Sequence, residues 1–174
     1  MDEIINLAGA VQRHDAPENI WKTLEIGLSK TFGFALFTIL VYDAKTGTVS
    51  RLYSTRLDVQ PVGARKWVTT SPWTQRVLKE GQPYLGSRKE DMKVFSEHAF
   101  LATIGCESVL NLPIRSSSSG DIIGSLNLLG AEHHYDQADV GLGFVFAQLV
   151  AGAVEAVRDE QFAQPFDDSK MESV

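Results

Sequence analysis

The sequence contains a single cysteine, Cys106, among its 174 residues. One cysteine cannot form an internal disulfide or a cysteine-rich zinc site, so the chain is not a disulfide-stapled secreted module. Basic residues are also scarce, because 16 Lys and Arg stand against 22 Asp and Glu and give a net charge of −6. Binding to nucleic acid requires clustered basic residues, so we expect no nucleic-acid partner.

Targeting signals and long apolar runs are missing as well. Residues 1–11 begin with Asp2 and Glu3, whereas a secretory signal peptide begins with basic residues. The apolar stretch 34–42 is too short to span a membrane, and the stretch 140–157 is interrupted by polar residues. We therefore expect a cytoplasmic protein that has no membrane partner.

The sequence signatures of P-loop proteins, zinc proteases and common hydrolases do not occur. His133 and His134 precede Asp136, but neighbouring side chains point in different directions and no cysteine is close to them. We therefore expect no metal site. The sequence does not indicate which cofactor, if any, the protein binds, and we predict no catalytic residue.

What the sequence does contain is a succession of periodic segments. Apolar residues at helical spacing predict helices over residues 2–13, 15–33, 71–81, 89–101 and 136–161. Segments rich in β-branched and aromatic residues predict strands over 34–43, 48–54, 66–69, 108–114 and 121–129. Most of these strands form hairpins, which predict an antiparallel sheet with the terminal helices on one face. The predicted fold class is therefore α+β.

Several residues mark the expected ends of the helices. Asp15 is expected to cap the second helix, and Pro17 fits its first turn. Gly33 is expected to end that helix in the left-handed conformation. Asp136 is expected to cap the closing helix, and the acidic chain beyond Pro165 is expected to be disordered.

Residues 73–84 end in Glu-Gly-Gln-Pro-Tyr, the first of four short motifs that occur in the order found in GAF domains, and they resemble that family's helix, Gly-Gln-Pro and strand. Residues 105–114 resemble its Gly-x-x-Ser strand with a proline, and residues 123–128 resemble the partner strand with a glycine and a leucine. Residues 135–139 resemble the start of its closing helix. The ordered match extends over roughly residues 15–160, so most of the chain resembles a GAF domain.

This resemblance implies a single antiparallel sheet with terminal helices on one face, a GAF/PAS-like architecture. The connection from about residue 61 to residue 105 would cover the other face and enclose a small-molecule pocket. We accordingly divide the chain into an N-terminal helix (1–14), a GAF-like domain (15–163) and a disordered acidic tail (164–174).

The resemblance also implies a non-enzymatic sensor that binds an unidentified small molecule. GAF domains are often joined to kinases, cyclases or transcription activators, whereas this chain resembles a free-standing GAF protein. We therefore expect the signal to pass to a separate partner protein. Apolar stripes at residues 4–11 and 140–157 further predict a homodimer through the terminal helices, since one domain need not cover both.

Two other functions stay open at this point. Free methionine sulfoxide reductases share the implied fold, and in such an enzyme Cys106 would attack the sulfoxide and depend on an external thiol. The other alternative is a pure dimerisation and assembly domain whose pocket has collapsed.

The candidate ligand-binding residues are polar residues on strands that would otherwise be apolar. Alternation along the strands predicts that Asn111, Ser125 and Asn127 share one face, where buried amides need partners that a ligand can supply. Arg51 and Tyr53 are two residues apart on another strand and are expected to share a face. The Arg51 guanidinium can then pair with a ligand carboxylate or phosphate.

Two tryptophans, Trp67 and Trp73, flank the expected cover and are predicted to stack on a flat ligand. A simpler interpretation remains open. In that interpretation the amides bond to each other or to water, Arg51 faces solvent, and the tryptophans belong to the core.

Overall fold

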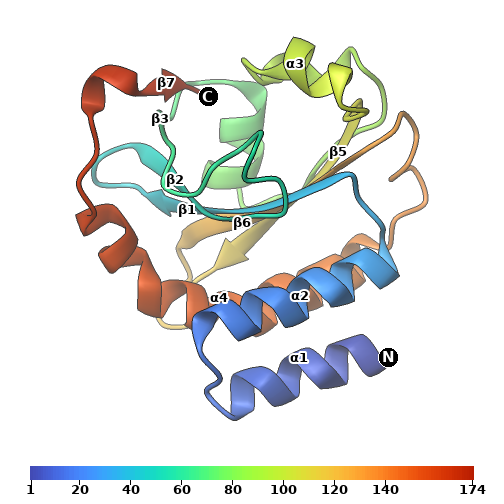
Figure 1. Cartoon of the computed structure of the whole chain (residues 1–174), viewed down its shortest axis with the longest axis vertical. Coiled ribbons are helices and arrows are strands. Elements are labelled where there is room, and N and C mark those ends of the chain that lie inside the picture. Colours follow the sequence, from blue (N-terminus) through green and yellow to red (C-terminus); the bar gives the residue numbers. More distant parts are fainter.

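The computed structural model describes residues 1–174 and has a curled sheet at its centre (Figure 1). The strand order is β4-β5-β6-β1-β2-β3-β7, and every pair is antiparallel except β3 and β7. The strands are β1 (Leu36–Asp43), β2 (Thr48–Ser54), β3 (Arg65–Trp67), β4 (Tyr84–Gly86), β5 (Ser108–Arg115), β6 (Ile122–Gly130) and β7 (Glu172–Ser173).

Three helices lie on one side of this sheet: α1 (Asp2–Gln12), α2 (Pro17–Thr31) and α4 (Val140–Ala163). Apolar side chains from α2, α4 and the sheet form the largest buried cluster, which has 20 members and includes Leu24, Phe37, Leu112 and Phe146. The α+β prediction, with the terminal helices on one face of an antiparallel sheet, is confirmed.

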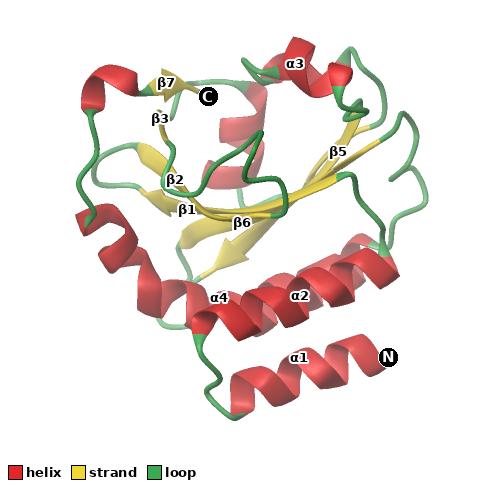
Figure 2. Ribbon diagram, viewed as in Figure 1, coloured by secondary structure: helices red, strands yellow, loops and turns green.

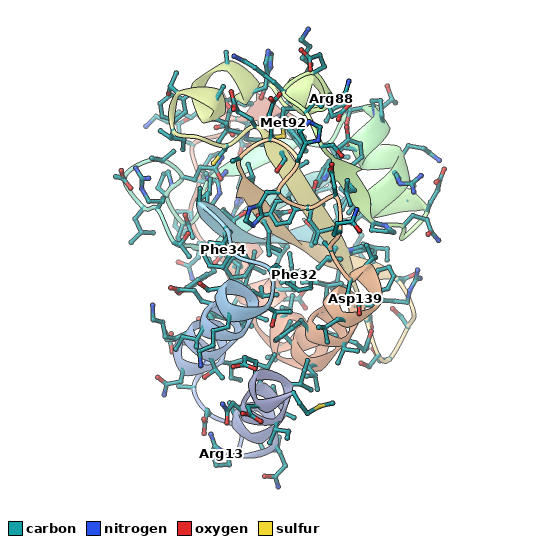
Figure 3. All side chains as sticks on the ribbon, turned by 90° about the vertical axis from the view of Figure 1, so that its right-hand side faces the viewer. Arg13, Phe32, Phe34, Arg88, Met92 and Asp139 are labelled. Carbon is teal, nitrogen blue, oxygen red and sulfur yellow. The ribbon has the colours of Figure 1, made fainter.

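The other face of the sheet is covered by short helical turns and loops, which we call the cover (Figure 2). The cover contains a π-helix η1 (Thr74–Lys79), a 3₁₀ turn η2 (Asp91–Val94) and the short helix α3 (His98–Thr103). Figure 3 shows Met92 in the cover and Arg13 at the opposite end of the molecule. The segments 71–81 and 89–101 are therefore helical as expected, but in shorter and less regular pieces.

The helix-end predictions were correct at two positions and wrong at two. Pro17 occupies the first turn of α2, and Gly33 follows that helix with a φ of +69°. Asp15 does not cap α2, because its carboxylate pairs with Arg13 at 2.8 Å. Asp136 does not cap α4 either. The α4 helix begins later, and the Asp139 carboxylate accepts a hydrogen bond from the Leu142 N–H at 3.0 Å (Figure 3).

The chain beyond residue 163 differs from the expected disordered tail. Its last residues add β7 in parallel to β3, and the Val174 carbonyl accepts a hydrogen bond from the Thr69 N–H at 2.7 Å. The Val174 side chain is buried in a cluster with Trp73 and Val77. An apolar residue at the end of an otherwise acidic segment supplies the burial that composition alone does not reveal.

The apolar stripe of α1 is covered within the protein itself. Leu7 and Ala10 are buried, and Ile4 and Val11 pack against the main core. The stripe on α1 therefore gives no separate support to the predicted dimer. The helix α4 is long and apolar enough to cross a membrane by length and composition, but six of its residues are buried and one face packs on the sheet.

Gly124 on β6 gives a stability prediction, because a Cβ at this position would collide with the backbone carbonyl of Leu40 on β1. Backbone atoms inside a sheet cannot move aside cheaply, so Gly124→Ala is expected to lower the free energy of unfolding by about 1–3 kcal/mol. Urea denaturation measures this change.

Gly152→Ala is the matched control, since Gly152 lies in α4 and its Cβ would meet no atom within 4 Å. Alanine favours helix, so this variant is expected to gain up to about 1 kcal/mol. A Gly124→Ala protein as stable as the parent would contradict the close contact.

Candidate ligand cavity

A cavity of about 70 Å³ lies between the sheet and the cover. Its walls come from β1, β2, β3, β5 and β6 on the sheet side and from Trp73, α3 and the neighbouring loops on the other. Nine of its 16 lining residues are hydrophobic, and the polar ones are Thr38, Arg51, Gln60, Lys66, Glu97, Asn111 and Asn127. A larger surface cleft of about 510 Å³ shares Arg51, Lys66 and Glu97 with the cavity, so it borders the cavity on one side.

A chain of buried amides forms the floor of this cavity. The Nδ2 of Asn127 donates to the Thr38 carbonyl at 3.5 Å and to the Thr38 hydroxyl at 3.3 Å. Its Oδ1 accepts from Asn111 Nδ2 at 2.6 Å and from Ser125 Oγ at 2.9 Å. Because a carbonyl only accepts, the Thr38 contact fixes the orientation of both amides. The Oδ1 of Asn111 is then left without a protein partner.

Arg51 on β2 is 5% exposed, although its guanidinium carries a charge. Its Nη1 donates to the Pro61 carbonyl at 3.1 Å, and its Nε has no hydrogen-bond partner in the protein. Burial lowers the pKa of Arg51, and the charges of Glu97 and Glu172 oppose this shift. An arginine in such a place can still accept an anionic partner, since it remains protonated under all ordinary conditions.

A second charged group lies beside Arg51. Lys66 Nζ pairs with Glu97 Oε2 at 2.9 Å, and Gln60 Nε2 donates to the same oxygen at 3.0 Å. Glu172 on β7 extends this group, with an oxygen 3.6 Å from Lys66 Nζ. One wall of the cavity is therefore polar, and the charge of Lys66 is partly neutralised there by Glu97 and Glu172. Apolar residues form the other walls.

Trp73, at the start of η1, is fully buried and packs edge-to-face against Phe95. Its indole Nε1 has no hydrogen-bond partner in the protein. Buried indole N–H groups usually have one. Of the four buried side-chain polar atoms without a partner, three therefore belong to residues that line this one cavity: Arg51, Trp73 and Asn111.

The predicted site residues are only partly brought together. Arg51, Trp73, Asn111 and Asn127 line the cavity. Ser125 lies on the same face of the sheet, fully buried behind Asn127, and acts on the cavity only through its hydrogen bond to that amide.

Tyr53 is not in the cavity, because a β-bulge interrupts the strand alternation. Ile39 on β1 pairs with Tyr53 and Leu40 pairs with Arg51, so Leu52 is the extra residue on β2. Ile39 and Leu40 are neighbours on β1 and point to opposite faces of the sheet. Their partners, Tyr53 and Arg51, therefore also point to opposite faces. Tyr53 therefore packs into the helix-side core and donates a hydrogen bond to Glu25 of α2.

Trp67 lies on β3 outside the cavity and is 46% exposed. It therefore does not stack on anything held under the cover. Sequence reasoning missed Thr38, Gln60, Lys66 and Glu97. Thr38 carried a usable signal, as a polar residue within an apolar strand. The other three reach the cavity from loops and from the three-residue strand β3, which are too short or irregular for periodicity to indicate direction.

Cys106 is buried on the cover side in a cluster with Met92 and Leu101. Burial raises the pKa of its thiol to about 11, and the charge of Arg56 opposes this only weakly. A thiol with this pKa is protonated at neutral pH and is a poor nucleophile.

The two adjacent histidines bind separate partners. His133 Nδ1 lies 2.8 Å from an Asp136 carboxylate oxygen, and His134 Nε2 lies 2.7 Å from the Phe32 carbonyl. No group of three or more His, Cys, Asp and Glu side chains is arranged to hold a metal ion.

Comparison with known proteins now adds the family context. A family model of the GAF domain matches residues 14–155. No curated protein matches the sequence.

Among solved structures, the GAF domain of a phosphoenolpyruvate-protein phosphotransferase from Coxiella burnetii is similar, with a TM-score of 0.68, 14% identity, and coverage of 91% of this chain and 96% of that one. The GAF domain of a two-component sensor histidine kinase from Bacillus halodurans has a TM-score of 0.63 and 20% identity, covering 84% and 97%. A free methionine-R-sulfoxide reductase from Neisseria meningitidis, solved with its substrate, has a TM-score of 0.66 and 14% identity, covering 90% and 89%. These similarities establish the fold.

The burial of Cys106 predicts slow chemistry at this thiol. Because its pKa is raised, the rate of alkylation by iodoacetamide is expected to stay low from neutral pH to about pH 9 and to rise only toward pH 11. Mass spectrometry of the labelled protein measures the rate. The urea-unfolded protein is the control and should react with an ordinary thiol pKa near 8.5. Equal rates for the folded and unfolded protein at neutral pH would contradict the buried thiol.

Proposed function

Because the chain belongs to the GAF domain family, we propose that it is a regulatory sensor domain that binds a small polar molecule in the cavity under the cover. The observation that carries this proposal is the set of three unpartnered polar atoms on Arg51, Trp73 and Asn111. Leaving a buried donor or acceptor unpaired costs about 1–3 kcal/mol, so a bound molecule that paired with these atoms would recover that free energy. Similar solved structures that come from sensor kinases and a chemotaxis protein support the regulatory part of the proposal.

The three atoms specify the chemistry of the ligand. Arg51 Nε and Trp73 Nε1 both donate, so the ligand needs acceptor oxygens, and a carboxylate suits the arginine best. Asn111 Oδ1 accepts, so the ligand also needs a hydroxyl or amino donor. A cavity of about 70 Å³ is small, since one water molecule needs roughly 10–15 Å³ on the same measure. The proposed ligand is therefore a small hydroxy- or amino-carboxylate.

A path from the cavity to α4 runs through β3. Arg65 Nη2 donates to the carbonyls of Gln161, Phe162 and Gln164 at 3.1, 2.9 and 2.7 Å, which satisfies the C-terminal end of α4. The next residue, Lys66, lines the cavity. We infer that a ligand orders the cover and shifts the packing of α4, and that a separate partner protein in the cytoplasm reads this change.

The reductase alternative is not supported by the thiol. Cys106 is buried, holds a raised pKa and does not line the cavity. Attack on a sulfoxide requires a thiolate that the substrate can reach.

A homodimer through the helical layer also belongs to this proposal. The stripe on α1 is covered, so the dimer now rests on α4, where Phe144 and Val145 are 38% and 43% exposed. Both residues are large and apolar, and two copies of α4 packed together would bury them.

The ligand proposal predicts a measurable stabilisation. A small hydroxy- or amino-carboxylate at 100 times its Kd should raise the free energy of unfolding by about 2.7 kcal/mol, which thermal-shift screening of such compounds detects. Asn111→Leu removes the acceptor and should abolish the response.

Trp67→Ala is the matched control, because Trp67 lies outside the cavity and should leave the response intact. If no compound stabilises the parent protein and no small molecule copurifies with it, the sensor proposal is wrong and the assembly function is favoured.

The dimer proposal predicts that Val145→Glu yields a monomer, because the charge would be buried against the second copy. Sedimentation velocity at micromolar concentration measures the mass. Ser29→Glu places the same charge on an exposed position of α2 and should not change the mass. A monomeric parent protein would rule the dimer out.

A further inference from the structure

A second concave site lies at the end of the sheet where the β1–β2 hairpin, η1, the β5–β6 connection and α4 meet. This cleft has a volume of about 350 Å³ and shares no lining residue with the cavity under the cover. Its charged lining residues are Asp43, Lys45, Lys79, Arg115, Asp121 and Arg158. We call it the basic cleft.

The basic cleft concentrates positive charge in a protein whose net charge is −6. Four cationic side chains face two carboxylates there. Lys45, Lys79 and Arg115 form no ion pair anywhere in the structure. Arg158 pairs only with the exposed Asp159 at 3.5 Å, where solvent screens the attraction.

Lys79 is held in place by an uncharged partner. Its Nζ donates to the Tyr42 hydroxyl at 2.8 Å and lies 5.4 Å from the centre of the same ring. The hydrogen bond fixes the ammonium group but does not neutralise it. An ammonium group has three N–H bonds, and the hydrogen bond to Tyr42 uses one of them. Lys79 therefore retains N–H donors for a ligand.

Arg115 is fixed in a similar way. Its Nη1 donates to the Gly120 carbonyl at 2.6 Å, and its guanidinium lies against Gly81, where any Cβ would collide with it. Gly81 has a φ of +64°, a conformation that glycine adopts without strain. The backbone on both sides thus holds the guanidinium while leaving its charge uncompensated.

One of the two carboxylates is held within a turn. Asp43 accepts hydrogen bonds from the Lys45 N–H at 2.9 Å and the Thr46 hydroxyl at 2.8 Å, within the β1–β2 hairpin. Its geometry is therefore set by the turn rather than by the cations around it. The second carboxylate, Asp121, forms no ion pair with these cations, so four positive side chains against two carboxylates leave the cleft with an excess of two positive charges.

We propose that the basic cleft binds a phosphate-bearing small molecule. An arginine presents a planar fork that matches phosphate oxygens, and lysines add point charges around it. A single carboxylate would neutralise only part of this charge, whereas a phosphoryl group carries close to two charges at neutral pH. The volume lies within the usual range of small-molecule sites, about 300–1,000 Å³. This site does not depend on the proposed sensor function.

Pyrophosphate is the probe for this site, and calorimetric titration of the full chain at low ionic strength measures its binding. We expect Lys79→Gln to weaken binding about tenfold, which corresponds to about 1.4 kcal/mol, because the variant loses a charged hydrogen-bond donor. Arg115→Gln should weaken it at least as much. Tyr42→Phe keeps the ring but removes the hydroxyl that positions Lys79, and should have a smaller effect in the same direction.

Lys93→Gln is the matched control, because Lys93 is an exposed lysine in η2 outside the cleft. Its affinity should equal that of the parent protein. Lys45→Gln serves as a further cleft variant if Arg115→Gln does not fold, since the Lys45 ammonium group makes no ion pair.

Three results would overturn the proposal. They are the absence of pyrophosphate binding, equal weakening by Lys93→Gln and Lys79→Gln, and loss of binding in Asn111→Leu. The second would mean diffuse attraction to surface charge, and the third would place the anion in the cavity under the cover. An acidic peptide that binds while pyrophosphate does not would point to a protein partner and equally reject the proposal.

Discussion

The central strands β1, β5 and β6 are buried on both faces, and this double burial governs the rest of the molecule. On the helix side it is satisfied by apolar packing, in a cluster of 20 buried residues. On the cover side the same strands carry Thr38, Asn111, Ser125 and Asn127, which must find hydrogen-bond partners away from water. Asn127 satisfies most of these polar groups, because it forms hydrogen bonds with Asn111, Ser125 and Thr38. The cavity lies next to this hydrogen-bond network.

The two faces of the sheet therefore differ in the amount of apolar packing that stabilises the segments on them. The cover packs on the sheet through two small clusters of six buried residues each, which include strand residues and are far smaller than the helix-side cluster. Segments with few apolar contacts open at lower free energy than the core. A bound molecule that pairs the free atoms of Arg51, Trp73 and Asn111 would act on the less stable half, which is where binding can most readily change conformation.

The sequence predicted the layer arrangement well, because hairpin spacing and helical periodicity are local signals. It also placed Asn111 and Asn127 together correctly, since the β5–β6 register is regular from Ser108 to Ile114. Alternation failed for Arg51 and Tyr53, because the bulge at Leu52 reverses the face within one residue. A bulge of this kind leaves no mark in composition.

Contacts made by irregular segments could not be predicted from the sequence either. Val174 returns to the cavity wall after an acidic segment, and Glu97 reaches Lys66 from a loop 31 residues away. Such pairings depend on where the cover is folded back over the sheet. They are set by tertiary packing rather than by any periodic pattern in the chain.

The sheet ends in very short edge strands, three residues in β4 and two in β7. An edge strand offers unpaired N–H and C=O groups to other chains, and long flat edges seed aggregation. Here β7 occupies the free side of β3, and neither remaining edge is long enough to recruit a foreign strand firmly. Crowded molecules of this protein would therefore meet through side-chain surfaces, and its solubility at high concentration depends on those surfaces rather than on its backbone.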